Sequence, residues 1–265
     1  MTDSITAKIA YASRLGGRQR YYANDHSRDT VVVDLQPMPI VDARDLGTRL
    51  DSDGFELAAH CSAVRDFEDL GEVAEVHRAE IAALLREVTG ADEVLVTAPG
   101  IVRYSEVCGK AGTRDNSYPA RFAHIDATAQ TSAGFAAGAL PDGRKTGRFA
   151  HYNVWRSFSG APQDVPLALC AAGSVAEQDL LIADAVFDAP GKPHWSFESW
   201  LLAHNPGHRW HWFPDMTRDE VIIFKSSDSV HFNPVPHVAF DCPAWPTALV
   251  PRVSIEMRAL AFWYA

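Results

Sequence analysis

The segment Ala-Arg-Phe-Ala-His-Ile-Asp-Ala-Thr (residues 120–128) marks the point at which the chain changes character. After it, short runs of β-branched and aromatic residues alternate with Pro, Gly and Asp turns; these runs span 149–155, 166–170, 210–213, 221–225 and 253–258. Several short strands at such spacing are typical of a sandwich or a barrel. The sequence therefore predicts a mainly β fold with flanking helices, built as a double-sheet jelly roll.

The part of the chain before residue 120 carries the clearest helix. Asp69 can cap a helix of about residues 71–88, because apolar residues recur there at helical spacing. Gly90 follows where a left-handed terminator belongs. We expect one domain of residues 1–265, with a helix-bearing part of about 1–120 and a jelly-roll part of about 121–265.

An earlier strand is predicted for residues 30–41, which begin with three consecutive valines after Thr30. Pro37 and Pro39 cannot donate a backbone hydrogen bond, and we expect them to end regular pairing. Residues 127–140 interrupt the β pattern with small residues and hydroxyls. This segment is predicted to be a helix or insertion that covers a bound substrate as a lid, with a rigid surface helix as the alternative.

Composition excludes several classes of protein. The chain has 265 residues, a net charge of −10 and 22% charged residues, which argues against a nucleic-acid partner. No apolar run approaches the length of a membrane span, so no membrane partner is expected. The four cysteines, at 61, 108, 170 and 242, lack C-x-x-C spacing, which favours a reducing, cytoplasmic setting.

The pair His124-x-Asp126 is the first candidate site. Residues i and i+2 of a strand point to the same side, so both side chains can reach one metal ion while Ile125 faces away. Two imidazoles and one carboxylate form the facial triad of non-heme Fe(II) oxygenases. The third ligand would come from downstream, where His231 and His237 are both candidates. Alone, His-x-Asp is weak, because a hydrogen-bonded strand histidine is the commoner explanation.

The second candidate site lies near the C-terminus. Arg252, Ser254 and Glu256 share one face of a predicted strand. A planar guanidinium suits the bidentate capture of a carboxylate, and a 2-oxoacid that chelates iron leaves such a carboxylate free. The alternative is a surface Arg–Glu pair along a solvated strand, an interpretation that suits Arg258 better than Arg252.

Many short motifs in order resemble those of one family. They are Val-Asp-Ala-Arg (41–44), Asp-Gly-Phe-Glu-Leu (53–57), Val-Thr-Gly-Ala (88–91), His-Ile-Asp (124–126), Tyr-Asn-Val-Trp-Arg (152–156), Pro-Leu-Ala-Leu-Cys (166–170), the run 208–221, Phe-Lys-Ser-Ser-Asp-Ser (224–229), Pro-His-Val-Ala-Phe-Asp (236–241) and Arg-Val-Ser-Ile-Glu-Met-Arg (252–258). On these residues the chain resembles the CmcJ/NvfI-like, or AsaB-like, Fe(II)/2-oxoglutarate-dependent oxidoreductases over most of its length.

The resemblance implies a cupin-like double-stranded β-helix fold and assigns roles to single residues. His124, Asp126 and His237 would be the catalytic iron ligands, with His237 preferred to His231 because its context matches. Arg252 would anchor 2-oxoglutarate, with Ser254 and Asn153 beside it, and the segment 153–156 would face the site. Ala171 and Ser227 depart from the family pattern, which makes transfer of a particular substrate unsafe.

The implied activity is that of a dioxygenase using Fe(II), 2-oxoglutarate and O₂. It would hydroxylate, desaturate or cyclise a small molecule of the secondary-metabolite type and release succinate and CO₂. The alternative is a cupin-like protein without oxidative chemistry, either a metal-dependent isomerase or a small-molecule binder. The sequence leaves open which substrate is used, which outcome follows, and whether the chain forms a homodimer.

Overall fold

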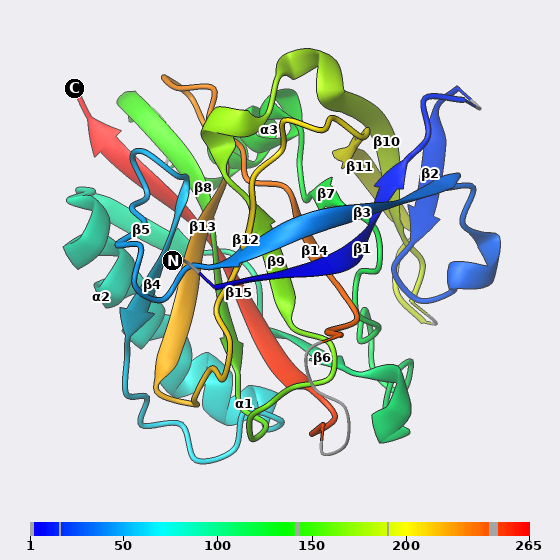
Figure 1. The fold of residues 1–265 in the computed structure, drawn as a ribbon. Helices are drawn as coiled ribbons and strands as arrows, with labels where there is room; N and C mark the ends of the chain where they lie inside the picture. Colours follow the sequence, from blue (N-terminus) through cyan, green and yellow to red (C-terminus); the bar gives the residue numbers. More distant parts are fainter. Residues whose placement is uncertain (1–2, 16, 141–143, 190, 244–248) are drawn as a thin grey trace.

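Two β-sheets form the body of the protein in the computed structural model, which describes residues 3–15, 17–140, 144–189, 191–243 and 249–265. Figure 1 shows the sheets facing each other, with α2 on the outside of one and α3 at one end of the body. The architecture is the mainly β jelly roll that the sequence predicted. Within the described residues, no helix combines the length and the apolar character needed to span a membrane.

The larger sheet has nine strands in the order β1-β3-β12-β9-β14-β7-β11-β10-β2. Their bounds are β1 Ser4–Ala12, β2 Gln19–Tyr22, β3 Val33–Asp42, β7 His124–Ile125, β9 Leu167–Cys170, β10 Leu180–Phe187, β11 Trp195–Leu202, β12 Trp210–Trp212 and β14 His237–Ala239. The short β7 and β14 are direct antiparallel neighbours. This pairing joins segments that lie more than a hundred residues apart in the sequence.

The smaller sheet has the order β4-β13-β8-β15-β5, and β6 also pairs with β15. Its strands are β4 Phe55–Ala59, β5 Glu93–Val96, β6 Ile101–Tyr104, β8 Thr146–Ser157, β13 Glu220–Asp228 and β15 Val253–Tyr264. The long β8 and β15 pair along most of their length. Strands from before and after residue 120 share both sheets, so the two predicted parts of the chain are interleaved.

The predicted N-terminal helix is confirmed, with one irregularity. It runs as α1 (Leu70–Glu72), a π-helical turn η2 (Val73–His77) and α2 (Arg78–Thr89). The Asp69 side chain accepts hydrogen bonds from two backbone amides of the first turn, and Gly90 ends the helix with φ +65°. Its apolar face packs on the outside of the smaller sheet, around Ile81 and Leu85.

The prediction that Pro37 and Pro39 end strand pairing is wrong. Both lie inside β3, opposite Lys8 and Thr6 of β1. In an antiparallel pair only alternate residues exchange hydrogen bonds with a given neighbour. Two prolines of the same parity can therefore both turn away from β1, where a missing N–H breaks no bond of that ladder. The other neighbour, β12, pairs only with residues 40–42 of β3.

A buried layer between the two sheets holds Phe55, Trp155, Leu169, Ile222 and Phe224. A second cluster occupies the opposite face of the larger sheet and includes Ile125, Cys170, Trp210 and Val238. Because side chains alternate along a strand, burying Ile125 and Val238 on that face turns His124 and His237 toward the smaller sheet. The alternation thus aims both imidazoles into the space between the sheets.

Candidate metal centre and adjoining cavities

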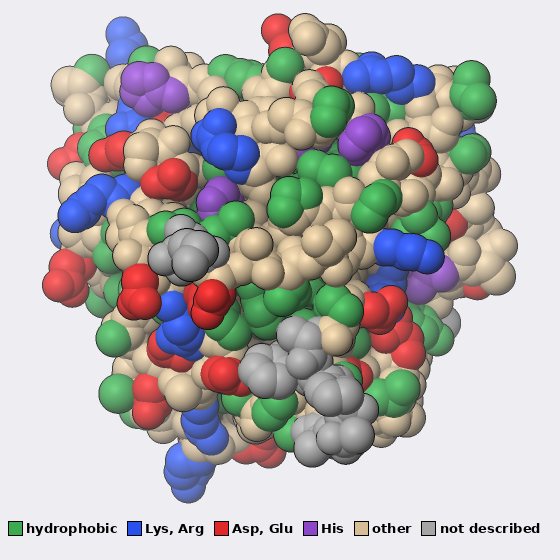
Figure 2. Space-filling view, in the orientation of Figure 1, with side chains coloured by type: hydrophobic (Ala, Val, Ile, Leu, Met, Phe, Trp, Pro, Cys, Tyr) green, Lys and Arg blue, Asp and Glu red, His purple; other side chains and the backbone are tan. Residues whose placement is uncertain are grey.

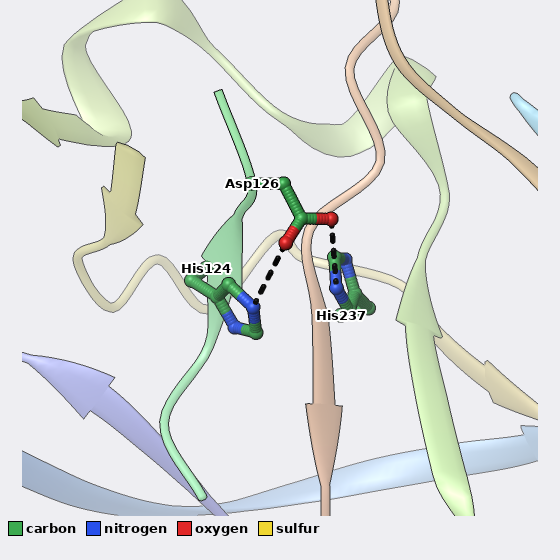
Figure 3. Close-up of side chains that lie close together, drawn as sticks. All are labelled: His124, Asp126 and His237. Atoms are coloured by element: carbon green, nitrogen blue, oxygen red, sulfur yellow. Dashed lines mark ion pairs between the residues drawn. The ribbon is translucent and has the colours of Figure 1, made fainter. Parts of the chain in front are cut away.

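His124, Asp126 and His237 come together at one point between the sheets. His124 and His237 are directly opposite each other in the β7–β14 pairing, and Asp126 follows the end of β7. One ligand atom from each of the three lies within 4.8 Å of the others, and all three side chains are buried. Figure 3 shows the carboxylate of Asp126 between the two imidazole rings. The structure therefore brings together the three residues that the sequence singled out.

Both imidazoles present the same nitrogen to the centre. His124 Nε2 is 3.8 Å from Asp126 Oδ1, and His237 Nε2 is 3.7 Å from Asp126 Oδ2. The other ring nitrogens contact backbone carbonyls, His124 Nδ1 with Phe122 O at 3.0 Å and His237 Nδ1 with Val235 O at 3.3 Å. A carbonyl accepts from N–H, which places the proton on Nδ1 and leaves Nε2 with a free lone pair.

The electrostatics favour the protonation states that bind a metal. Burial, together with the neighbouring His237, lowers the pKa of His124 to about 3, and burial also lowers the pKa of His237. Burial alone would raise the pKa of Asp126, but Arg258 and the two imidazoles hold it well below its ordinary value. At neutral pH the set is two neutral imidazoles and one carboxylate, which suits Fe(II).

Asp126 is held by two donors from the smaller sheet. Arg258 Nη2 donates to Asp126 Oδ1 at 2.5 Å, and Asn153 Nδ2 donates to Asp126 Oδ2 at 2.5 Å. The Asn153 oxygen in turn accepts from Ser226 Oγ at 3.3 Å. Asn153 was expected beside a co-substrate, but both ends of its amide are engaged in contacts around Asp126.

The interpretation of Arg258 as a surface residue is wrong. Its guanidinium is 13% exposed and lies between the carboxylates of Asp126 and Glu256, with Nε 2.8 Å from Glu256 Oε1. The strand alternation that grouped Arg252, Ser254 and Glu256 on one face also includes residue 258, so the signal was present in the sequence. Its nearness to the chain end concealed it.

Arg252 occupies a different chamber on the other side of the histidines. It is 1% exposed, and its Nε and Nη2 atoms have no hydrogen-bond partner among the described residues. Its guanidinium lines a small chamber together with His124, His237, Trp155 and others. The neighbouring Ser254 is fully buried, and its hydroxyl likewise has no partner in the part of the chain described.

The unpartnered atoms in this chamber fit a small dicarboxylate. A buried guanidinium without an anion is costly, and burial lowers the pKa of Arg252 to about 10, so it stays charged at neutral pH. A ligand that brings a carboxylate to Arg252 would satisfy both orphaned nitrogens at once. Arg156, from the segment expected to face the site, instead points away and donates to His60 O at 3.1 Å.

A cavity of about 930 Å³ opens on the remaining side of Asp126. Its walls are mainly apolar and come largely from residues 97–102, α3 (Ala129–Ala139) and the β10–β11 hairpin, with residues 114–116 also among them. Phe187, Trp195 and Phe197 stack on one another with ring centroids 4.8–5.3 Å apart, and Phe135 of α3 meets Phe197 edge-on at 5.3 Å. This aromatic wall is suited to an apolar small molecule.

His151 is a polar group in this apolar cavity that the sequence did not indicate. It is 3% exposed, and its Nδ1 lies 3.5 Å from Ser132 Oγ of α3. No hydrogen bond of its Nε2 occurs within the described residues. Burial, with Arg258 nearby, lowers the pKa of His151 to about 4. It lies two residues before Asn153 on β8, so strand alternation would have placed it on the same face.

Jelly-roll proteins with two histidines and one carboxylate around an open metal position form the class of non-heme iron oxygenases. Residues 9–262 match the family described as an oxidoreductase/YMDC permease-like domain, and the chain belongs to that family. The resemblance to the NvfI-like and AsaB-like oxidoreductases is thereby confirmed.

Similar proteins come from fungi. The hydroxylase/desaturase efuI of Hormonema carpetanum is 29% identical over 81% of this chain and 78% of its own length. The hydroxylase/desaturase CTB9 of Cercospora beticola is 30% identical over 81% of this chain and 72% of its own. The alpha-ketoglutarate-dependent dioxygenase phiK of a fungal species (strain ATCC 74256) is 28% identical over 86% and 84%.

A solved structure of the iron and alpha-ketoglutarate-dependent endoperoxidase NvfI superposes with a TM-score of 0.84. The match covers 100% of this chain and 99% of that one at 22% identity. The likeness supports the jelly-roll fold across the full length of the chain.

Proposed function

We propose that this protein is an Fe(II)/2-oxoglutarate-dependent dioxygenase that hydroxylates, desaturates or cyclises an apolar small molecule, with release of succinate and CO₂. The observation that carries the proposal is the buried guanidinium of Arg252, whose Nε and Nη2 have no hydrogen-bond partner among the described residues and which lines the same chamber as His124 and His237. A binder or a non-redox isomerase needs a metal site but has no use for a second anion site beside it. The similar hydroxylases, desaturases and dioxygenases support this choice.

His124, Asp126 and His237 would hold the iron, each through one atom. When bound, Fe(II) supplies the redox chemistry that couples decarboxylation of 2-oxoglutarate by O₂ to oxidation of the substrate. The chain's own part is to hold both imidazoles neutral with Nε2 inward and the carboxylate ionised. Asp126 lines the 930 Å³ cavity, and His124 and His237 line the smaller chamber, so a metal held by the three would adjoin both.

Arg252 would bind the distal carboxylate of 2-oxoglutarate through its two free nitrogens, and the Ser254 hydroxyl would add a third donor. Arg258 is unsuited to this task because Asp126 and Glu256 already engage it. We assign Asn153 to the orientation of Asp126 rather than to the co-substrate, because its amide is engaged at both ends.

The 930 Å³ cavity would take the substrate, since it reaches Asp126 from the side opposite Arg252. Helix α3 supplies Gly134, Phe135 and Gly138 to its wall and begins three residues after Asp126. We propose that α3 acts as a lid that tightens over bound substrate. Limited proteolysis within α3 should slow when Fe(II), 2-oxoglutarate and an apolar occupant are added, and equal cleavage would contradict the lid.

Succinate formation tests the proposed function directly. Purified protein with Fe(II), 2-oxoglutarate and O₂ should release succinate slowly even without its native substrate. Omitting Fe(II), or keeping oxygen out, should stop the release. A protein that binds Fe(II) but never converts 2-oxoglutarate would support the non-oxidative alternative.

Two further proposals concern the location of the protein and its partners. The spacing of the four cysteines, with no C-x-x-C pair, supports a reducing, cytoplasmic location. Figure 2 shows acidic and basic side chains interspersed over one face, which supports a small-molecule substrate rather than a nucleic acid. Size-exclusion chromatography with light scattering would decide between a monomer and the homodimer that the sequence leaves open.

A further inference from the structure

The position of the Asp126 carboxylate depends on the sheet opposite the one that carries it. Asp126 follows the last residue of β7, a strand of only two residues. Its side chain reaches across to the smaller sheet and receives one hydrogen bond on each oxygen. The two donors, Arg258 of β15 and Asn153 of β8, are direct cross-strand partners. Neighbouring strands thus grip the carboxylate from both sides.

Arg258 is itself fixed by a second carboxylate. Its Nε donates to Glu256 Oε1 at 2.8 Å, while its Nη2 donates to Asp126. Glu256 is 4% exposed and lies on the same face of β15, two residues before Arg258. Burial by itself would lower the pKa of Arg258, but the two carboxylates raise it, so the guanidinium is charged at all ordinary pH values. A planar guanidinium that is hydrogen-bonded at two points has little freedom to rotate.

We propose that Glu256, Arg258 and Asn153 form a clamp that fixes the orientation of the Asp126 carboxylate for metal binding. Each carboxylate oxygen has about two lone-pair directions, and the clamp occupies one on each. A carboxylate held at both oxygens has little freedom to rotate, so its remaining lone pairs stay on the side of His124 Nε2 and His237 Nε2. The inference rests on the proposed metal site, with Arg258 as a positioning residue that acts through Asp126.

A purely neutralising role for Arg258 predicts the opposite change in metal affinity. If Arg258 merely neutralised Asp126 in place of a metal, it would compete with the ion, and its removal would tighten metal binding. A clamp works the other way, because its loss frees the carboxylate and weakens a preorganised site. Partners that orient metal ligands typically contribute ten- to hundred-fold to metal affinity. The sign of the change in metal affinity therefore separates the two roles.

The test uses Co(II) as a redox-silent probe of the purified protein, with affinity measured by calorimetry and coordination followed by visible absorption. Arg258→Met should raise the Kd for Co(II) by about ten- to hundred-fold and change the intensity of the absorption bands. Arg258→Lys should recover part of the affinity, since an ammonium can reach Asp126 or Glu256 but cannot bridge both. The matched control is Arg148→Met, which removes a different Arg–Asp pair, between Arg148 of β8 and Asp228 of β13. It should leave both readouts unchanged.

Unchanged or tighter Co(II) binding by Arg258→Met, with an unchanged spectrum, would overturn the clamp. If Arg258→Met does not fold, Arg258→Lys answers alone: wild-type affinity and spectrum would overturn the proposal, and a several-fold weaker Kd with altered bands would support it. Wild-type protein that binds no Co(II), or binds it equally well after His124→Ala, would instead refute the metal site. Failure of the clamp and failure of the proposed function therefore give different results.

Discussion

The two sides of the His124–Asp126–His237 centre are built differently. The side toward Arg252 is a small chamber whose walls are mostly strand residues, with charged or polar groups at its far end. The opposite side is a 930 Å³ cavity with mainly apolar walls from α3, a hairpin and the loop before β6. The chamber is proposed to recognise one small dianion, and most of its walls cannot change without changing the sheets. The cavity walls can vary without disturbing the core.

This contrast explains how one scaffold can combine a fixed co-substrate with varied substrates. The groups proposed to serve every turnover lie in or beside the paired strands: His124 on β7, His237 on β14, and Arg252 directly before β15. The groups that would select a substrate lie on α3 and on the ends of β10 and β11. Changes on the first side should therefore alter the use of 2-oxoglutarate. Changes on the second side should alter only what occupies the cavity.

Loss of one of the three proposed metal ligands, which lie between the chamber and the cavity, should have the largest effect. His124→Ala, Asp126→Ala and His237→Ala should each abolish Fe(II)-dependent succinate formation, because two ligands make a poor site. The fold should persist, as checked by circular dichroism. His231→Ala is the control, since His231 is exposed and no metal-ligand group includes it within the described residues. Full activity in His237→Ala with loss in His231→Ala would refute the assignment.

Arg252→Ala should have the second largest effect, and this effect should be confined to binding in the chamber. Removing the partner of a buried carboxylate costs on the order of 2–5 kcal/mol, which corresponds to a rise of about 30-fold to several thousand-fold in the KM for 2-oxoglutarate. Arg252→Lys should rescue only partly, since a point charge does not reproduce the fork. Steady-state kinetics of succinate release measure both. An unchanged KM would show that the chamber does not bind the co-substrate.

The sequence revealed much of the centre but not what surrounds it. His124 and Asp126 follow from a period of two along a strand, and Arg252 follows from the same rule near the C-terminus. Arg258 was misjudged because of its nearness to the chain end, although the same alternation places it on the face of Arg252. Its partner Asp126 lies 132 residues away, and no local pattern encodes that contact. The aromatic wall was missed because β10 and β11 were not predicted.

Filling the cavity should have a smaller effect, confined to the apolar side. An added side chain at Gly138 of α3 meets no atom within 4 Å of its first carbon, and Gly138 lines the cavity. Gly138→Ala should stabilise the helix by about 0.5–1 kcal/mol, and Gly138→Leu should also occupy space. We expect Gly138→Leu to weaken binding of the apolar dye 1-anilinonaphthalene-8-sulfonate several-fold. Gly138→Ala should bind the dye nearly as well as the wild type, and neither variant should change the KM for 2-oxoglutarate. A raised KM would mean that the two sides are not independent.

The smallest expected effect tests whether the cavity is as dry as its walls indicate. Burial lowers the pKa of His151 to about 4 in the folded protein, against about 6.5 for an unfolded chain. Between these values the unfolded state binds a proton that the folded state does not, so His151 contributes stability that is present above pH 6.5 and lost as the pH falls toward 4.

In metal-free protein, His151→Leu should reduce the slope of unfolding free energy against pH by about 1.4 kcal/mol per pH unit within this window. Urea unfolding between pH 4.5 and 7.5 measures the slope, while above pH 7 the two curves should run parallel. Parallel curves over the whole range would mean that water reaches and protonates His151 in the folded state, and the contrast between a polar chamber and an apolar cavity would not hold.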